Sequence, residues 1–285
     1  MTNHVVVVSI DGLRPDAIAE AHAATLERLI REGSAAAVAQ TILPSTTLPS
    51  HTSMLTGLGP AQHGVTWNST EVDPWGTVAV PTVFEIAHAR GFRTAAFFSK
   101  SKFGYLQRKG SLDYTELPSR SAPNWLLGRT VADAEHYLAQ NHPNLLFVHI
   151  GEPDYAGHGA GWMSPLYIRA VAAADDGLAR VVTAADQSFG AGAYTLIVTG
   201  DHGGHDRVHG SGDPQDLTIP WIAWGEGVVA GGTLADTVRT MDTAATVLWL
   251  LGVPVPKAWA GIPQVNAFTA AAREKADAAL ASPPR

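Results

Sequence analysis

The stretch Val5-Val6-Val7-Val8-Ser9-Ile10 is followed directly by Asp11-Gly12. A continuous apolar run of this length, rich in β-branched side chains, is typical of a strand that is buried on both faces. Such strands belong to parallel sheets whose two faces are covered by helices. The segment therefore predicts an α/β protein, and the polar pair Asp11-Gly12 is expected to end the strand.

The rest of the chain alternates in the same way. Further strands are predicted at residues 93–98, 144–150 and 194–199. Helices are predicted at 25–32 with Thr25 as the cap, at 82–90, from Ser164-Pro165 to about residue 185, and at 235–251. Strands that alternate with helices indicate βαβ units, so we expect a mostly parallel central sheet with helices on both faces.

The length of 285 residues suits one large domain. We expect a single domain over residues 1–285, without a large cap domain. A small polar insertion is expected near residues 100–125, and a terminal helix with a frayed tail at 270–285.

Composition excludes several classes of function. Charged residues make up 16% of the chain, the net charge is −7, and no basic stretch stands out. Recognition of a nucleic-acid polymer is therefore not expected. The chain has no cysteine, so a transition metal must be held by histidine and carboxylate ligands. Features of a signal peptide and apolar runs of about 20 residues are missing, which predicts a cytoplasmic protein without membrane attachment.

Three predicted strands end in polar clusters, at 11–12, 151–154 and 200–203. Because sites in open α/β sheets form beyond the carboxyl ends of the strands, these clusters are expected to converge. A single aspartate after a strand is commonly a turn former, so the prediction depends on the whole set. Three carboxylates and three imidazoles suit two zinc ions, or manganese or iron in their place. The candidate ligands are Asp11, Asp154, His158, Asp201, His202 and His209.

The segment 44–57 places several hydroxyl groups at the start of a short helix that Gly57 is expected to end. A hydroxyl there meets the positive end of the helix dipole, and a nearby zinc ion would make it a usable nucleophile. The same residues could instead serve only as a helix cap. The segment by itself leaves both interpretations open.

The order of motifs along the chain resembles the alkaline phosphatase superfamily, and within it the type I phosphodiesterase/nucleotide pyrophosphatase branch. The resemblance runs from residue 4 to about residue 225 and rests on the following elements: Asp11-Gly12, Thr47-Leu48-Pro49-Ser50-His51, Thr56-Gly57, His63-Gly64, Pro153-Asp154-Tyr155-Ala156-Gly157-His158, Asp201-His202-Gly203 and His209-Gly210.

This resemblance implies a role for each matching residue. Thr47 corresponds to the nucleophile, which forms a covalent phosphothreonine, and Asn68 corresponds to a phosphate-binding asparagine. One metal is implied at Asp11, Thr47, Asp201 and His202, and the other at Asp154, His158 and His209. His205 lies in the same loop as His209, which we favour because glycine follows it. His51 is expected to be a structural hydrogen-bonding residue, and His149 a core histidine.

The resemblance predicts a two-metal phosphohydrolase that acts on a small phosphate ester. For any single aromatic residue near the motifs we prefer core or lid packing, but their clustering favours a phosphodiester with an aromatic or apolar leaving group. These residues are Trp67, Trp75, Phe103, Tyr105, Tyr155 and Trp162. Lys100 and Lys102 could serve a monoesterase, but we expect them to be solvated surface residues. A phosphomonoesterase, a phosphonate hydrolase, a mutase and a non-catalytic metal- or phosphate-binding protein remain alternatives.

Overall fold

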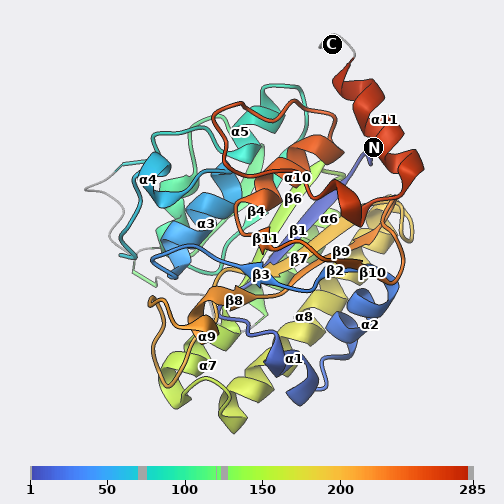
Figure 1. Ribbon diagram of the computed structural model, residues 1–285. Helices are drawn as coiled ribbons and strands as arrows, with labels where there is room; N and C mark the ends of the chain where they lie inside the picture. Colours follow the sequence, from blue (N-terminus) through green and yellow to red (C-terminus); the bar gives the residue numbers. More distant parts are fainter. Residues whose placement is uncertain (1, 70–75, 120, 123–127, 282–285) are drawn as a thin grey trace.

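In the computed structural model the first strand, β1, lies inside an eight-stranded sheet (Figure 1). The structure describes residues 2–69, 76–119, 121–122 and 128–281. The strands follow the order β10 (Gly232–Leu234), β2 (Ser34–Ala36), β9 (Trp221–Gly225), β7 (Thr195–Gly200), β1 (Val5–Ile10), β6 (Leu145–Ile150), β4 (Thr94–Phe97) and β5 (Tyr114–Glu116). Only β9 runs antiparallel to its neighbours. The predicted mostly parallel sheet is therefore confirmed.

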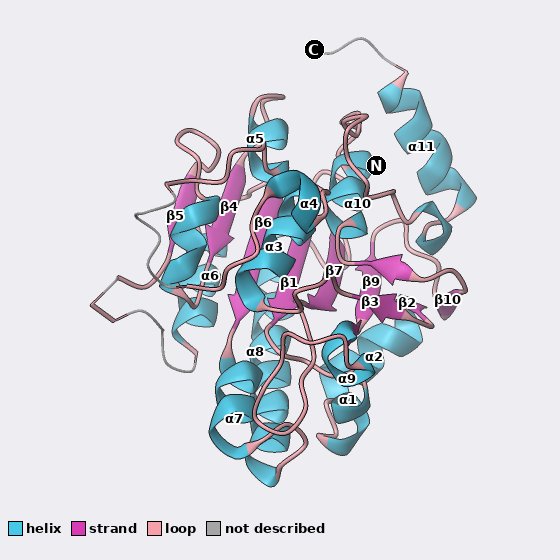
Figure 2. Ribbon diagram, turned by 60° about the vertical axis from the view of Figure 1, so that its left-hand side comes forward, coloured by secondary structure: helices cyan, strands magenta, loops and turns pink. Residues whose placement is uncertain are grey.

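Helices cover both faces of this sheet (Figures 1 and 2). One layer contains α3 (Thr47–Thr56), α4 (Pro60–His63), α5 (Val83–His88) and α10 (Asp242–Leu250). The other contains α1 (Asp16–Glu20), α2 (Ala24–Glu32), α6 (Arg129–Leu138) and α8 (Pro165–Phe189). The remaining elements are the helices α7 (Glu152–Ala160), α9 (Pro214–Leu217) and α11 (Ala270–Leu280), two short 3₁₀ helices (Ser101–Leu106 and Val265–Ala267), and a small sheet of β11 (Val238–Arg239), β3 (Ala39–Gln40) and β8 (Thr218–Ile219).

Strand β1 is buried on both faces, as its composition predicts. Val5 and Val7 belong to the core beneath α3, α5 and α10. Val6, Val8 and Ile10 point to the opposite face and pack in the core that α1, α2, α6 and α8 cover. Burial of one such side chain contributes about 1.5–3 kcal/mol, so β1 ties the two layers together.

The N-terminus of α2 differs from the prediction. Thr25 was expected to cap this helix. The residue at the cap position is Ala23, and its side chain makes no capping hydrogen bond. The carboxylate of Asp175, on α8, instead accepts hydrogen bonds from Thr25 N at 2.9 Å and Leu26 N at 2.8 Å. The helix is thus capped from a neighbouring helix, which local sequence patterns cannot reveal. Thr82 and Ser164 do cap α5 and α8 with their own side chains.

The helix predicted at 235–251 begins seven residues later than expected, at Asp242. Residues Val238–Arg239 form β11 and pair with β3. The Asp242 carboxylate holds this turn, because its oxygens accept from Arg239 N and Ile262 N, each at 2.9 Å. The prediction was wrong at this end because the pairing partner lies about 200 residues away.

The segment near 100–125 contributes to the main sheet. Its strand β5 pairs in parallel with β4 and forms one edge of the sheet. Residues 120 and 123–127 lie outside the described part of the chain, as do residues 282–285 of the expected tail. Within the described part, no helix combines the length and apolar character that crossing a bilayer requires.

Candidate metal and phosphate site

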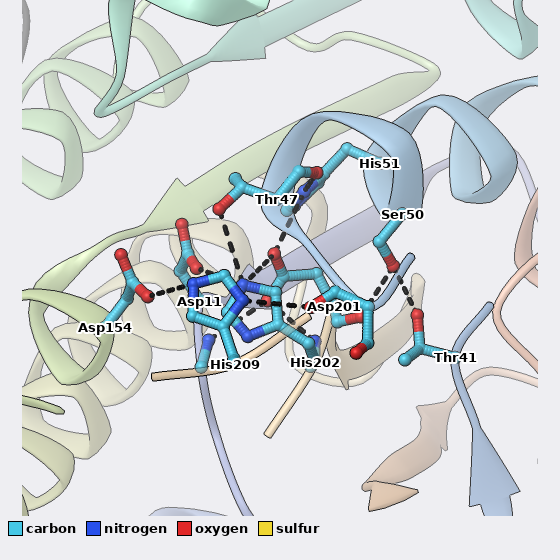
Figure 3. A network of polar contacts seen from close by, with 12 residues as sticks. Asp11, Thr41, Thr47, Ser50, His51, Asp154, Asp201, His202 and His209 are labelled. Carbon is cyan, nitrogen blue, oxygen red and sulfur yellow. Dashed lines mark hydrogen bonds and ion pairs between the residues drawn. The ribbon is translucent and has the colours of Figure 1, made fainter. Parts of the chain in front are cut away.

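The three predicted polar clusters meet at the carboxyl ends of the neighbouring central strands β7, β1 and β6. Strands β6 and β7 flank β1 in parallel register, with Ile10 opposite both Ile150 and Gly200. Asp11 and Asp201 directly follow their strands, and α7 begins two residues after β6 and carries Asp154 (Figure 3). All three carboxylates are buried. The expected convergence therefore occurs.

Gly12 holds these three segments together. Its φ of +71° is a left-handed conformation that favours glycine, and a Cβ atom there would lie 3.1 Å from Asp154 Cα. Its N–H donates to Asp201 Oδ1 at 3.0 Å. Its carbonyl oxygen accepts from Trp162 Nε1 at 3.0 Å and from Tyr167 Oη at 2.8 Å. This single residue thus links the end of β1 to Asp201 after β7, to Trp162 after α7 and to Tyr167 on α8.

Asp11, Asp201 and His202 form what we call the inner cluster. Their ligand atoms all lie within 4.8 Å of one another. His202 Nε2 is 3.3 Å from Asp11 Oδ1 and 3.3 Å from Asp201 Oδ2. All three side chains have 0% exposure, so water cannot compensate the two negative charges.

Asp154, His158 and His209 form what we call the outer cluster. His158 Nε2 lies 3.3 Å from Asp154 Oδ1 and 3.1 Å from His209 Nε2. His209 Nε2 is 3.5 Å from the same carboxylate oxygen. The His202 and His209 rings stack with centroids 3.7 Å apart, and Asp154, His202 and His209 also have ligand atoms within 4.8 Å of one another. The two clusters are therefore contiguous.

The tautomers of the three histidines suit metal binding. His202 Nδ1 donates to Gly203 O at 2.8 Å, His209 Nδ1 to Ser45 O at 2.9 Å, and His158 Nδ1 to Arg207 O at 3.0 Å. A carbonyl oxygen only accepts hydrogen bonds, so Nδ1 carries the proton in each ring. The Nε2 atom of each ring faces a carboxylate oxygen. Metal-ligating histidines are oriented in this way, by a carbonyl on the other ring nitrogen.

The carboxylates also fit a cation. Four buried oxygens of these carboxylates accept no hydrogen bond from the described residues: Asp11 Oδ1 and Oδ2, Asp154 Oδ1 and Asp201 Oδ2. Of these, Asp11 Oδ2 lies beside the Lys100 ammonium. Burial, together with the charge of Asp11, raises the pKa of Asp201 to about 8. Buried carboxylates are normally paired or bound to a metal, and this nitrogen and oxygen donor set suits zinc, manganese or iron. The residues present therefore fit the divalent ions that the sequence predicts.

His205 does not belong to the outer cluster. Its Nδ1 lies 2.7 Å from Asp216 Oδ1, and the other oxygen of Asp216 accepts from Ser211 Oγ at 2.7 Å. This pair anchors the loop that carries His209. Of the two candidates, the structure thus places His209 beside Asp154.

Thr47 is the first residue of α3, and its side chain is buried beside the inner cluster (Figure 3). Its Oγ1 lies 3.4 Å from His202 Nε2. His51 Nδ1 is 2.8 Å from Thr47 O, and His51 Nε2 is 2.8 Å from Ser9 Oγ on β1. These bonds fix the helix terminus against the sheet, and they agree with the structural role expected of His51.

The prediction that Lys100 and Lys102 are solvated surface residues is wrong. They are 3% and 8% exposed. Lys102 Nζ lies 2.9 Å from Asn68 Oδ1, which also accepts from Leu48 N at 3.0 Å. Lys102 Nζ and Leu48 N both donate to this oxygen. Neither contact uses the Asn68 amide nitrogen, which can therefore donate to another group. Burial, with the charge of Lys100, lowers the pKa of Lys102 to about 8.

Lys100 and His149 contact the metal-binding candidates directly. Lys100 Nζ is 2.5 Å from Asp11 Oδ2 and 2.6 Å from Asp154 Oδ2. His149 Nε2 is 3.0 Å from Asp11 Oδ2, and its Nδ1 is 2.7 Å from Ser99 Oγ. His149 is buried as predicted, but its contact with Asp11 was missed. To predict this contact one must know how β6 aligns with β1, because that alignment sets His149 opposite Ser9.

Three of the six aromatic residues suggested for stacking on a leaving group belong to the interior. Phe103, Tyr105 and Trp162 are at most 6% exposed. Phe103 packs edge-on against the His51 ring at 4.7 Å. Trp75 lies outside the described residues. The aromatic argument for a diester substrate is correspondingly weak.

Comparisons with known proteins identify the family of this chain. The sequence profile of the type I phosphodiesterase/nucleotide pyrophosphatase family matches residues 5–211. Mouse ectonucleotide pyrophosphatase/phosphodiesterase 5 has a similar structure, with a TM-score of 0.75 and 16% identity over 89% of this chain and 96% of that one. That likeness shows a shared fold.

Two curated relatives are named as a transferase and a mutase. GPI ethanolamine phosphate transferase 1 of Gibberella zeae is 23% identical over 95% of this chain, which spans only 33% of the transferase. The 2,3-bisphosphoglycerate-independent phosphoglycerate mutase of Haloarcula marismortui is 28% identical over 54% of this chain and 28% of the mutase. The profile match covers well over half of the chain, and so the chain belongs to the type I phosphodiesterase/nucleotide pyrophosphatase family of the alkaline phosphatase superfamily.

Proposed function

We propose that this chain is a metal-dependent phosphohydrolase that transfers the phosphoryl group of a phosphate ester to Thr47 and then to water. The main support is the position of the Thr47 hydroxyl, at the first residue of α3 and 3.4 Å from His202 Nε2. This hydroxyl is buried beside the inner cluster, so it lies where a divalent cation held there would activate it.

Each cluster would hold one ion in this proposal. Asp11, Asp201 and His202, with Thr47, would hold the first. Asp154, His158 and His209 would hold the second. When bound, such ions act as Lewis acids that lower the pKa of a hydroxyl group and neutralise charge on phosphoryl oxygens. Zinc fits the ligands best, with manganese or iron as alternatives.

The reaction would take two steps. In the first, Thr47 Oγ1 loses its proton to solvent and bonds to phosphorus, while the bond from phosphorus to the leaving oxygen breaks and that oxygen gains a proton. In the second, water attacks phosphorus, and the bond to Thr47 Oγ1 breaks with return of the proton. Two in-line displacements predict retention of configuration at phosphorus. The Asn68 amide nitrogen would donate to a non-bridging oxygen as charge develops there.

The two lysines change the expected substrate class from diester to monoester. Among the described residues Lys102 forms no ion pair, although it is almost fully buried. A buried ammonium without an anionic partner is costly, and a terminal phosphoryl group beside Asn68 would supply that partner. A monoester carries one more negative charge than a diester at this position. The charge of the site therefore favours a phosphomonoester, or a phosphonate of equal charge.

Transfer to an alcohol is the second candidate. The two curated relatives are named as a transferase and a mutase, so in those enzymes an acceptor hydroxyl takes the place of water. Both candidates share the first step with Thr47 and differ only in what attacks phosphorus in the second.

Turnover of p-nitrophenyl phosphate and bis-p-nitrophenyl phosphate, with chelator and after zinc is restored, tests the proposal. We expect the monoester to be cleaved faster, only with metal, and Lys102→Met to lower monoester turnover more than diester turnover. A preference for the diester that survives in wild type and variant alike would refute the monoester assignment. Addition of ethanolamine or glycerol separates transfer from hydrolysis, because transfer yields a new phosphate ester in place of inorganic phosphate.

A further inference from the structure

Lys100 occupies an unusual position between the two clusters. Its ammonium lies between Asp11 of the inner cluster and Asp154 of the outer cluster, at 2.5 and 2.6 Å. The Tyr155 ring covers a third side, with its centroid 5.0 Å from Nζ, where a cation is attracted to the ring face. The lysine side chain is 4% exposed. Lys100 is thus held in place by both clusters and shielded from water.

Lys100 and the histidines use different oxygens of the same carboxylates. Lys100 Nζ contacts Oδ2 of both Asp11 and Asp154. The histidine Nε2 atoms face Oδ1 of both, at 3.3 Å for His202 to Asp11 and 3.3 Å for His158 to Asp154. One oxygen of each carboxylate thus points to a candidate metal ligand set, and the other to the ammonium. A lysine and a metal ion can therefore share each carboxylate.

The shared carboxylates determine whether Lys100 raises or lowers the affinity for metal. A hydrogen-bonding partner of a metal ligand commonly orients it and strengthens metal binding, by about 10–100-fold. An ammonium acts in the opposite direction, because it withdraws negative charge from the carboxylate and repels the divalent ion. Two cations a few ångströms apart repel strongly at a buried site. For Lys100 the repulsion should exceed the loss of orientation.

We propose that Lys100 is a built-in competitor for the metal-binding carboxylates, which holds Asp11 and Asp154 in position before metal binds and lowers the affinity for both ions. This inference rests on the proposed two-metal function. It predicts a site that is already formed without metal and that exchanges its ions more readily than a site with the same ligands and no lysine. Lys102, which contacts Asn68 and neither carboxylate, should not act in this way.

The test measures zinc binding and thermal stability of the purified full-length protein. Wild type, Lys100→Gln and Lys102→Gln are stripped with chelator and titrated with buffered zinc, and melting temperatures are recorded with and without zinc. In Lys100→Gln we expect zinc to bind at least about tenfold more tightly, because one repelling charge is gone. We also expect a lower melting temperature without zinc and a larger rise when zinc is added. Lys102→Gln should change the metal affinity less than Lys100→Gln does, because the Lys102 ammonium contacts Asn68 and forms no ion pair with the carboxylates among the described residues.

The possible outcomes separate the hypotheses. Equal or weaker zinc binding in Lys100→Gln than in wild type, with an unchanged zinc-induced rise in melting temperature, would overturn the competitor role. No zinc binding by wild type would instead refute the proposed function itself. Should Lys100→Gln not fold after metal removal, Lys100→Arg keeps the positive charge and is purified alongside it. Wild-type zinc affinity in Lys100→Arg supports the charge explanation, whereas tightened binding there contradicts it.

Discussion

The inner and outer clusters differ in how they are built, although they share a boundary at His202 and His209. The inner carboxylates directly follow two central strands, and its three side chains are fully buried. The outer cluster combines helix α7 with the loop after β7, and the His158 side chain is 47% exposed. The nucleophile candidate Thr47 lies beside the inner cluster. A rigid side thus holds the reacting hydroxyl, while the accessible side can admit water and release the leaving group.

Replacement of Thr47 tests the inner side and should have the largest effect. We expect Thr47→Ala to reduce turnover at least about 10⁴-fold, since the covalent path is lost and only binding and electrostatic effects remain. Zinc content should stay near that of wild type, because the remaining ligands are unchanged. Steady-state kinetics and metal analysis measure the two quantities.

Thr47→Ser serves as the matched control, because it keeps a hydroxyl at the same helix position. It should retain measurable turnover and trap phosphate on the serine in rapid-quench experiments. Turnover in Thr47→Ala within tenfold of wild type would remove the covalent role.

The His205 and His209 pair tests the outer side. His209→Ala removes an Nε2 atom that faces Asp154 Oδ1 at 3.5 Å, and should weaken one of two zinc sites by at least about 100-fold. His205→Ala removes only the contact with Asp216. Calorimetric zinc titration should therefore give one tight ion per chain for the first variant and two for the second. Two tight ions in His209→Ala and one in His205→Ala would instead identify His205 as the ligand.

The pH dependence of phosphate inhibition tests the contribution of Lys102. Burial, together with the charge of Lys100, lowers the pKa of Lys102 to about 8, so the ammonium that attracts phosphate is present below pH 8 and is lost as the pH rises. The inhibition constant of phosphate should increase up to about tenfold per pH unit above this value. In Lys102→Met inhibition should be weak and nearly flat over the same range. Parallel curves for the two proteins would show that another group causes the change.

The smallest expected effects are on stability, and they again contrast the two sides. Asp201 is buried and its pKa is raised to about 8, by burial first and then by Asp11. Above the ordinary carboxyl pKa, folding must therefore either protonate Asp201 or bury its charge, and both oppose folding. In chelator at neutral pH, Asp201→Asn should thus melt higher than wild type, by about 2–4 °C per kcal/mol gained.

His158→Ala is the control for this experiment, because His158 is half exposed. Its free energy of unfolding without metal should change by less than about 0.5 kcal/mol. With zinc present, both variants should lose part of the stabilisation that wild type gains. A lower melting temperature for metal-free Asp201→Asn would show that its Oδ1 contacts outweigh the buried charge.

Sequence patterns predicted the parts of the fold that depend on nearby residues. Strands β1, β6 and β7 follow from their apolar runs, and Asp11 and Asp201 follow from their position at strand ends. The starts of α5 and α8 follow from the helices predicted at 82–90 and from Ser164-Pro165 onward. In each case the relevant physical interaction lies within a few residues of the signal.

The failures share a different cause, which is a partner distant in sequence. The cap of α2 comes from Asp175, 150 residues away, and residues 238–239 become a strand because β3 lies next to them. Lys100 and Lys102 read as surface lysines because lysine is rarely buried. Their burial depends on β4 lying beside β6. This pairing lets Lys100, three residues beyond the end of β4, reach Asp11 and Asp154.

The central place of β1 also sets the order in which the protein can be assembled. Its hydrogen-bonding partners are β6 and β7, which end at residues 150 and 200. At ribosomal rates of about 5–20 residues per second, the edges of β1 stay unpaired for roughly 10–40 s. An apolar strand with open edges is a template for aggregation, so the nascent chain should depend on chaperones until β7 emerges. Ribosome-bound chains that stop before β6 should be captured by chaperones more than chains that include β7.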